Sequence, residues 1–202
     1  MENENSNEID VIKEVKNWDE LELKEDILRG IYAHGFETPS QIQKTAILPI
    51  IEKRDVIAQA PSGTGKTGTF SIASLERVDL TVNKTQVLIL APTHELVKQI
   101  SSVIESIGNH LNGLRIKTLV GGTSVIEDTD TIKKNVPHII VGSVGRVHDM
   151  MRRRVIKPSD IKLFVLDEAD EMLSGGFLDN IHQMFTTFNE GIQVAIFSAT
   201  LP

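Results

Sequence analysis

A chain of 202 residues with 40% hydrophobic side chains can bury one core of ordinary size, so we expect a single compact domain. The chain has no cysteine, which excludes disulfides and thiol chemistry, and no apolar run of the length of a membrane span or secretory signal, which predicts a soluble intracellular protein. The net charge of −7 excludes nucleic-acid binding over a broad basic surface, so any such contact has to be local.

The N-terminal end is rich in Asn and Glu, and we predict a mobile polar tail over residues 1–17 followed by the folded part over residues 18–202. The apolar positions of Leu21–Ala33 share one helical face, and Gly35 is placed to end that helix. The next helix should carry Gln43 in its first turns. Its N-cap, first residue and capping-box partner are predicted to be Thr38, Pro39 and Gln41.

Short apolar segments then recur, each too short for a helix and rich in Val, Ile and Leu. Helical patterns such as Leu96–Ile107 and Ile181–Phe188 separate them. This alternation predicts an α/β fold with a doubly wound, mostly parallel sheet, helices on both faces, and ligands beyond the carboxyl ends of the strands. We predict strands buried on both faces over Asp55–Gln59, Val87–Ala91, Ile116–Val120, His138–Val141, Leu163–Leu166 and Val194–Phe197.

The segment Ala60–Thr67, with the letters APSGTGKT, follows a predicted strand and opens a predicted helix, which is the context of a phosphate-binding loop. Glycines allow backbone amides to turn toward a phosphate, Lys66 supplies a positive charge, and the Thr67 hydroxyl can bind Mg²⁺. The flanking elements disfavour the alternative of a glycine-rich turn with a stray lysine. The predicted phosphate-binding residues are Ser62, Gly63, Thr64, Gly65, Lys66 and Thr67.

A phosphate loop needs an acidic group at the end of a neighbouring strand, and Asp167, Glu168 and Asp170 follow the predicted strand Leu163–Leu166. We predict that Asp167 holds Mg²⁺, directly or through water, and that Glu168 orients and deprotonates the attacking water. Lys66, Asp167 and Glu168 are thus the predicted catalytic residues. The alternative, carboxylates at a solvated helix N-terminus, is disfavoured by the phosphate loop.

The letters DEAD at 167–170 resemble the motif of the DEAD-box RNA helicases, and the other motifs of their first RecA-like domain occur here in order. Phe36 and Gln43 resemble the residues that bind adenine in that family. Trp18 resembles the upstream aromatic residue that supports this site. The segment Ser198–Thr200 resembles a motif that bonds to the last acidic residue of the box, and the resemblance places Ser198 and Thr200 at the nucleotide site.

The same resemblance implies an RNA-binding set formed by Pro92, Thr93, His94, Gly121, Gly122, Ser143, Gly145 and Arg146. Several positions depart from the family pattern; Ser143, for example, stands where threonine is usual but keeps a hydroxyl. His94 stands where arginine is usual, so a neutral imidazole would lose a phosphate contact. Val144 stands where proline is usual and lacks its fixed φ angle. RNA affinity is therefore expected to differ from that of typical members.

Within the family, Leu28–Tyr32, Asp55–Gln59 and Asp167–Leu173 with Gly176–Phe177 are most similar to the eukaryotic translation initiation factor 4A group. That similarity implies an ATP- and Mg-dependent RNA helicase acting in translation initiation in the cytoplasm, together with a scaffold protein of the translation initiation factor 4G type. It also implies a second RecA-like domain with arginine fingers outside this chain. We therefore expect the chain alone to be monomeric and nearly inactive as an ATP hydrolase.

Two other functions fit the same motifs. The first is an ATP-gated RNA clamp that nucleates a ribonucleoprotein assembly, as expected for the nuclear, exon-junction paralogue of the group. The second is a different phosphate-loop enzyme, such as a small-molecule kinase or a DNA helicase. The residues resembling an adenine site ahead of the loop and the Ser198–Thr200 motif behind it disfavour this second function.

Overall fold

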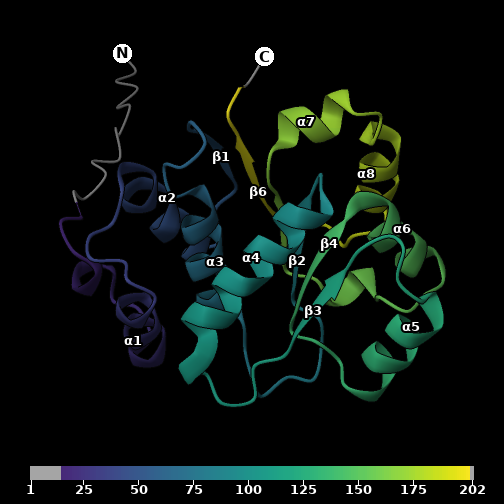
Figure 1. Cartoon of the computed structure of the whole chain (residues 1–202), viewed down its shortest axis with the longest axis horizontal. Coiled ribbons are helices and arrows are strands. Elements are labelled where there is room, and N and C mark those ends of the chain that lie inside the picture. The colour runs from purple at the N-terminus through teal and green to yellow at the C-terminus, as the bar shows by residue number, and fades with distance from the viewer. Residues whose placement is uncertain (1–14, 201–202) are drawn as a thin grey trace, which may run out of the picture.

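The computed structural model describes residues 15–200, so most of the predicted tail, residues 1–14, lies outside the described residues (Figure 1). Packed structure begins earlier than the predicted boundary at Trp18. Val15 is fully buried, and the Asn17 side chain accepts a hydrogen bond of 3.2 Å from the amide of Glu20 at the start of a 3-10 helix. The folded part of the chain therefore includes at least residues 15–17.

The described strands form one six-stranded sheet in the order β1-β6-β5-β2-β4-β3, and each adjacent pair is parallel. This arrangement confirms the predicted doubly wound α/β fold. All carboxyl ends of the strands consequently lie along one edge of the sheet. The strands are β1 (Val56–Gln59), β2 (Val87–Ala91), β3 (Ile116–Leu119), β4 (Ile139–Ser143), β5 (Leu163–Leu166) and β6 (Gln193–Ser198).

The prediction that all six strands are buried on both faces is wrong for the two outer strands. In β1 the burial alternates, and Ile57 is 67% exposed. Most residues of β3 are only half-buried, whereas β2, in the middle of the sheet, is buried along its whole length. The reason is that β1 and β3 occupy the two edges of the sheet, where helices cover the strands less completely.

Helices cover both faces of the sheet, as predicted (Figure 1). Alternate strand residues point to opposite faces, so Val87 and Ile89 of β2 join a core under α1–α4, and Leu88 and Leu90 join a core under α5–α8. Among the described residues, no helix combines the length and apolar character needed to cross a membrane. The α-helices are α1 (Glu25–Ala33), α2 (Gln41–Ile51), α3 (Lys66–Arg77), α4 (His94–Ile107), α5 (Val125–Lys134), α6 (Val144–Arg152), α7 (Ala169–Ser174) and α8 (Leu178–Phe185).

Helices α1 and α2 start later than predicted. The expected helix Leu21–Ala33 is divided into a 3-10 helix (Trp18–Leu21) and α1, because Glu22 adopts a left-handed conformation with φ of 53°. The N-cap of α2 is Ser40 rather than Thr38. Its capping-box partner is Gln43, whose side-chain oxygen accepts a hydrogen bond of 2.8 Å from the Ser40 amide. The chain stays extended through Ser40, so Pro39 precedes the helix instead of opening it.

Candidate functional site

The phosphate loop connects the end of β1 to the start of α3. Gly63 and Gly65 have φ angles of 80° and 100°, in the left-handed region that favours glycine. A Cβ atom on Gly65 would also lie 2.7 Å from the Ser40 hydroxyl oxygen. Gly65 caps α3, so the first amides of this helix point toward the loop, an arrangement that favours an anion.

Lys66 links this loop to the acidic residues after β5. Its side chain is buried, and its ammonium group donates a hydrogen bond of 3.0 Å to the carbonyl oxygen of Ala60. The same nitrogen lies 3.3 Å from a carboxylate oxygen of Glu168. The structure therefore brings together two of the three predicted catalytic residues, although they are far apart in the sequence.

Asp167, the third of these residues, is 3% exposed at the end of β5. Burial and the nearby Glu168 carboxylate raise its pKa to about 6, while Lys66 acts in the opposite direction. Its Oδ1 atom has no hydrogen-bond partner among the described residues. A buried carboxylate oxygen without a donor suits a hard divalent cation, so Asp167 fits the predicted Mg²⁺ site.

Glu168 occupies a strained position next to it. The residue is the N-cap of α7 and has a φ angle of 50°, which is uncommon for a side chain of this size. Such backbone strain persists where the surrounding structure fixes the residue, and here the ion pair with Lys66 holds the carboxylate. The result is a carboxylate placed at the opening of the phosphate loop.

Asp170 is hydrogen-bonded to Thr200, which follows the end of β6. The Thr200 hydroxyl donates a hydrogen bond of 2.6 Å to its Oδ2 atom, and the Thr200 amide donates another of 3.2 Å. These contacts match the bond implied by the family resemblance, and Ser198 supports them by donating to the Thr200 carbonyl. The Thr200 hydroxyl is the main cause that lowers the pKa of Asp170 to about 2.

The aromatic part of the site is built from the N-terminal residues. The Phe36 ring stacks on the Trp18 ring, with centroids 6.2 Å apart and an interplanar angle of 19°. The Trp18 indole nitrogen donates a hydrogen bond of 3.1 Å to the Phe36 carbonyl oxygen. Because Trp18 is fully buried, it supports Phe36 from behind instead of contacting a ligand itself.

Gln43 joins the start of α2 to the phosphate loop. Its side chain is 4% exposed, and its amide nitrogen lies 3.3 Å from the Gly65 carbonyl oxygen. A Cβ atom on Gly68 would lie 2.7 Å from this nitrogen and 2.9 Å from the Phe36 ring. Sequence reasoning missed Gly68, although an isolated glycine inside a predicted helix is a signal that could have found it.

The predicted RNA-binding residues follow three other strands. Pro92 follows β2, and Thr93 caps α4 by accepting a hydrogen bond of 3.2 Å from the Leu96 amide. The imidazole of His94 lies beside Gly121 in the loop after β3, since a Cβ atom on that glycine would be 3.4 Å from the His94 Nε2 atom. Gly122 has a φ angle of 83°, so this loop also needs glycine.

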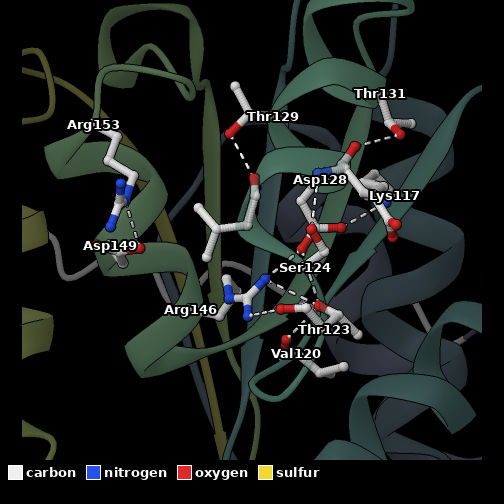
Figure 2. A network of polar contacts seen from close by, with 12 residues as sticks. Lys117, Val120, Thr123, Ser124, Asp128, Thr129, Thr131, Arg146, Asp149 and Arg153 are labelled. Carbon is white, nitrogen blue, oxygen red and sulfur yellow. Dashed lines mark hydrogen bonds and ion pairs between the residues drawn. The ribbon is translucent and has the colours of Figure 1, made fainter.

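The segment after β4 differs from its expected role at one position. Ser143 is the N-cap of α6, and Gly145 is exposed. The Arg146 guanidinium, in contrast, is buried and bonds to Asp128 and Thr123 (Figure 2), so it points into the protein. Val144 is the first residue of α6, a position that suits proline but does not require it, and its side chain fills the core.

The predicted phosphate and metal residues and the predicted RNA-binding residues occupy different halves of one sheet edge. The former follow β1, β6 and β5, which are neighbours, and the latter follow β2, β4 and β3, which are neighbours as well. The predicted adenine residues Trp18, Phe36 and Gln43 precede β1 in the sequence. The halves meet where β5 pairs with β2, and there the Asp167 amide donates a hydrogen bond of 2.9 Å to the Leu90 carbonyl oxygen.

A parallel sheet with this phosphate loop and this acidic strand end defines a phosphate-loop ATPase domain of the RecA-like class. The sequence profile of the DEAD/DEAH box helicase family matches residues 40–202. The chain belongs to that family, whose nucleotide is ATP.

The chain is 52% identical over 93% of its length to the ATP-dependent RNA helicase eIF4A of Chaetomium globosum, and to the protein of the same name from Yarrowia lipolytica. It covers 47% of each, so it spans about half the length of these curated relatives. The fold is similar to that of a DEAD box protein from Methanococcus jannaschii, with a TM-score of 0.89 and 34% identity over 94% of this chain and 52% of that one. It is also similar to S. cerevisiae Dbp5 bound to RNA and ADP BeF3, with a TM-score of 0.82 and 37% identity over 93% of this chain and 47% of that one.

Proposed function

We propose that the protein containing this chain is an ATP-dependent RNA helicase of the translation initiation factor 4A group. It couples ATP binding and hydrolysis to local unwinding of RNA duplexes in translation initiation. The observation that supports this proposal is that the residues predicted to bind phosphate and metal and those predicted to bind RNA follow neighbouring groups of strands along one sheet edge. The 52% identity to the two eIF4A proteins supports the choice of group. By the same likeness we place the protein in the cytoplasm, with a scaffold partner of the initiation factor 4G type.

On the nucleotide half, the amides of the loop 62–65 and the N-terminus of α3 bind the phosphates of ATP. Lys66 exchanges its present contacts for the β- and γ-phosphates, and Phe36 and Gln43 hold the adenine. Thr67 and Asp167 would hold Mg²⁺, which neutralises charge on the phosphates when bound. Glu168 then orients the attacking water and accepts its proton.

On the RNA half, backbone groups at Thr93, Gly121, Gly122 and Gly145 approach the sugar-phosphate chain, and His94 adds a weaker contact than arginine would. These contacts are local, which agrees with a chain of net charge −7. The hydrogen bonds between Thr200 and Asp170 connect the acidic residues to β6, so a change at the γ-phosphate can move both strand ends together.

Two substitutions in the full-length protein test the nucleotide site. Lys66→Ala should weaken binding of a fluorescent ATP analogue, because it removes a cation from the phosphate site. Glu168→Gln should leave that affinity within about twofold and lower RNA-stimulated ATP turnover by roughly two orders of magnitude or more, the usual contribution of a general base. Glu171→Gln, an exposed residue of α7, is the matched control and should leave both unchanged.

Equal loss of nucleotide binding in both variants would refute the role given to Glu168. Duplex unwinding measured on the wild-type protein tests the wider proposal. RNA retained for many turnover times with slow ATP hydrolysis and no unwinding would favour the RNA clamp instead.

A further inference from the structure

Asp128 places a buried carboxylate beneath the RNA half of the sheet edge. It belongs to α5 and is 5% exposed. One of its oxygens lies 2.8 Å from the Lys117 ammonium on β3, and the other lies 2.5 Å from the Arg146 guanidinium on α6 (Figure 2). A single side chain of α5 therefore binds two cations that belong to two different elements.

Thr123 completes this network. Its carbonyl oxygen accepts a hydrogen bond of 2.7 Å from Arg146, and its hydroxyl oxygen lies 3.0 Å from the same guanidinium and 3.1 Å from the Asp128 carboxylate. The single hydroxyl proton is shared between the Asp128 carboxylate and the carbonyl oxygen of Val120, which lies 3.0 Å away. Charge-assisted hydrogen bonds of this kind are directional and stronger than neutral ones, so the network holds its members in a defined geometry.

The bonded residues are direct neighbours of the predicted RNA contacts. Thr123 comes immediately after Gly121 and Gly122, and Arg146 comes immediately after Gly145. The glycines have no side chains with which to fix their own positions, so the loops depend on adjacent residues for their spacing. The Asp128 network thus forms a polar link between the loop after β3 and the first turn of α6.

We propose that Asp128 is a positioning residue for RNA binding, which sets the distance between these two loops through Arg146 and Thr123. The inference rests on the proposed RNA-binding function and adds a residue that the family motifs do not include. It also assigns Arg146 a different role from the expected one. The guanidinium holds the loops together from inside the protein, and the backbone of the loops contacts the RNA.

The direction in which one substitution changes the RNA affinity distinguishes this proposal from a purely electrostatic effect of Asp128. Asp128→Asn removes a negative charge near the RNA-binding edge, which by charge alone should strengthen RNA binding. If Asp128 positions the loops, the same change weakens binding. We expect the RNA concentration for half-maximal ATP turnover in the full-length protein to rise roughly tenfold, as for the loss of one charge-assisted hydrogen bond. The turnover rate at saturating RNA and the KM for ATP should stay unchanged, because the proposed phosphate and metal residues follow β1, β5 and β6 and the proposed adenine residues precede β1.

Asp130→Asn is the matched control. Asp130 lies on the same helix, is exposed, and loses the same charge in the substitution. Its RNA requirement should stay equal to that of the wild type or fall slightly. Asp128→Glu keeps the charge and should recover part of the lost affinity. Thr123→Val replaces one hydroxyl group with a methyl group on an exposed residue, so it keeps the test valid if Asp128→Asn does not fold. It should weaken RNA binding as well.

An unchanged RNA requirement in both Asp128→Asn and Thr123→Val would overturn the proposal. Tighter RNA binding by Asp128→Asn than by Asp130→Asn would also overturn it, because Asp128 would then be withholding Arg146 from RNA. Failure of the underlying function gives a different result, in which the wild-type protein itself shows no RNA-stimulated ATP turnover.

Discussion

Replacing Asp167 with Asn should stabilise the nucleotide-free protein above neutral pH. Burial raises the pKa of this carboxyl from 3.8 to about 6, so the folded chain holds the proton more tightly than the unfolded chain does. The stabilisation from the protonated carboxyl is therefore fully present below pH 3.8 and is lost as the pH rises through about 6. Asparagine has the shape of the protonated side chain and keeps this stabilisation at every pH.

The size of the effect follows from the pKa change. Each pKa unit corresponds to about 1.4 kcal/mol, so a rise from 3.8 to about 6 gives up to about 3 kcal/mol in the free energy of unfolding at pH 8. For a chain of this length the melting temperature should rise by roughly 6–12 °C. At pH 5 the gain should fall to about half, because the unfolded chain is ionised there while the folded chain is mostly protonated.

Thermal and urea unfolding of Asp167→Asn and wild type between pH 5 and pH 8 measure this difference, with Asp130→Asn as a control for the loss of an exposed charge. Adding Mg²⁺ and a non-hydrolysable ATP analogue at a hundred times its Kd should stabilise the wild type by about 2.7 kcal/mol. The variant should gain much less, because its amide is a poor ligand for the cation. A variant that is less stable than the wild type at pH 8, or a gain independent of pH, would refute the reasoning.

Two further substitutions test the surroundings of the site. Gly68→Ala adds a Cβ atom that would lie 2.7 Å from the Gln43 amide nitrogen and 2.9 Å from the Phe36 ring. Titration should therefore show roughly tenfold weaker binding of ATP and of adenosine. Affinities equal to those of the wild type would argue against this packing. Thr200→Val removes the main hydrogen bond that lowers the pKa of Asp170 to about 2. The pKa of Asp170 measured by carboxyl NMR titration should therefore rise toward 3.8. An unchanged pKa would show that other contacts are the main cause of the low value.

The elements and the phosphate loop could be predicted because local chemistry defines them. Runs of Val, Ile and Leu such as Val87–Ala91 form a strand wherever both faces are covered, and Gly63 and Gly65 have few other uses between a strand and a helix. The capping of α2 was harder to predict, because Thr38 and Ser40 are both good N-cap residues and only the extended backbone at Ser40 decides between them.

The order of the strands could not be predicted, because the hydrophobic period is the same for an edge strand and a central strand when the apolar run is short. Ile57 illustrates this, since it lies in an apolar run and is nevertheless largely exposed. The inward orientation of the Arg146 side chain could not be predicted from the sequence either. Its partner Asp128 is one of several carboxylates on α5, and nothing in the spacing of that helix singles it out.

The separation of the sheet edge into two halves affects which positions of such a domain can change in sequence without altering its nucleotide site. His94 and Val144, two positions that depart from the family pattern, follow strands of the half predicted to bind RNA. Neither contacts the phosphate loop or the acidic residues through a hydrogen bond or ion pair of the described structure. On the proposed function, RNA preference can therefore diverge by exchange of single residues at the starts of α4 and α6, while the residues proposed to bind ATP on the neighbouring strands stay the same.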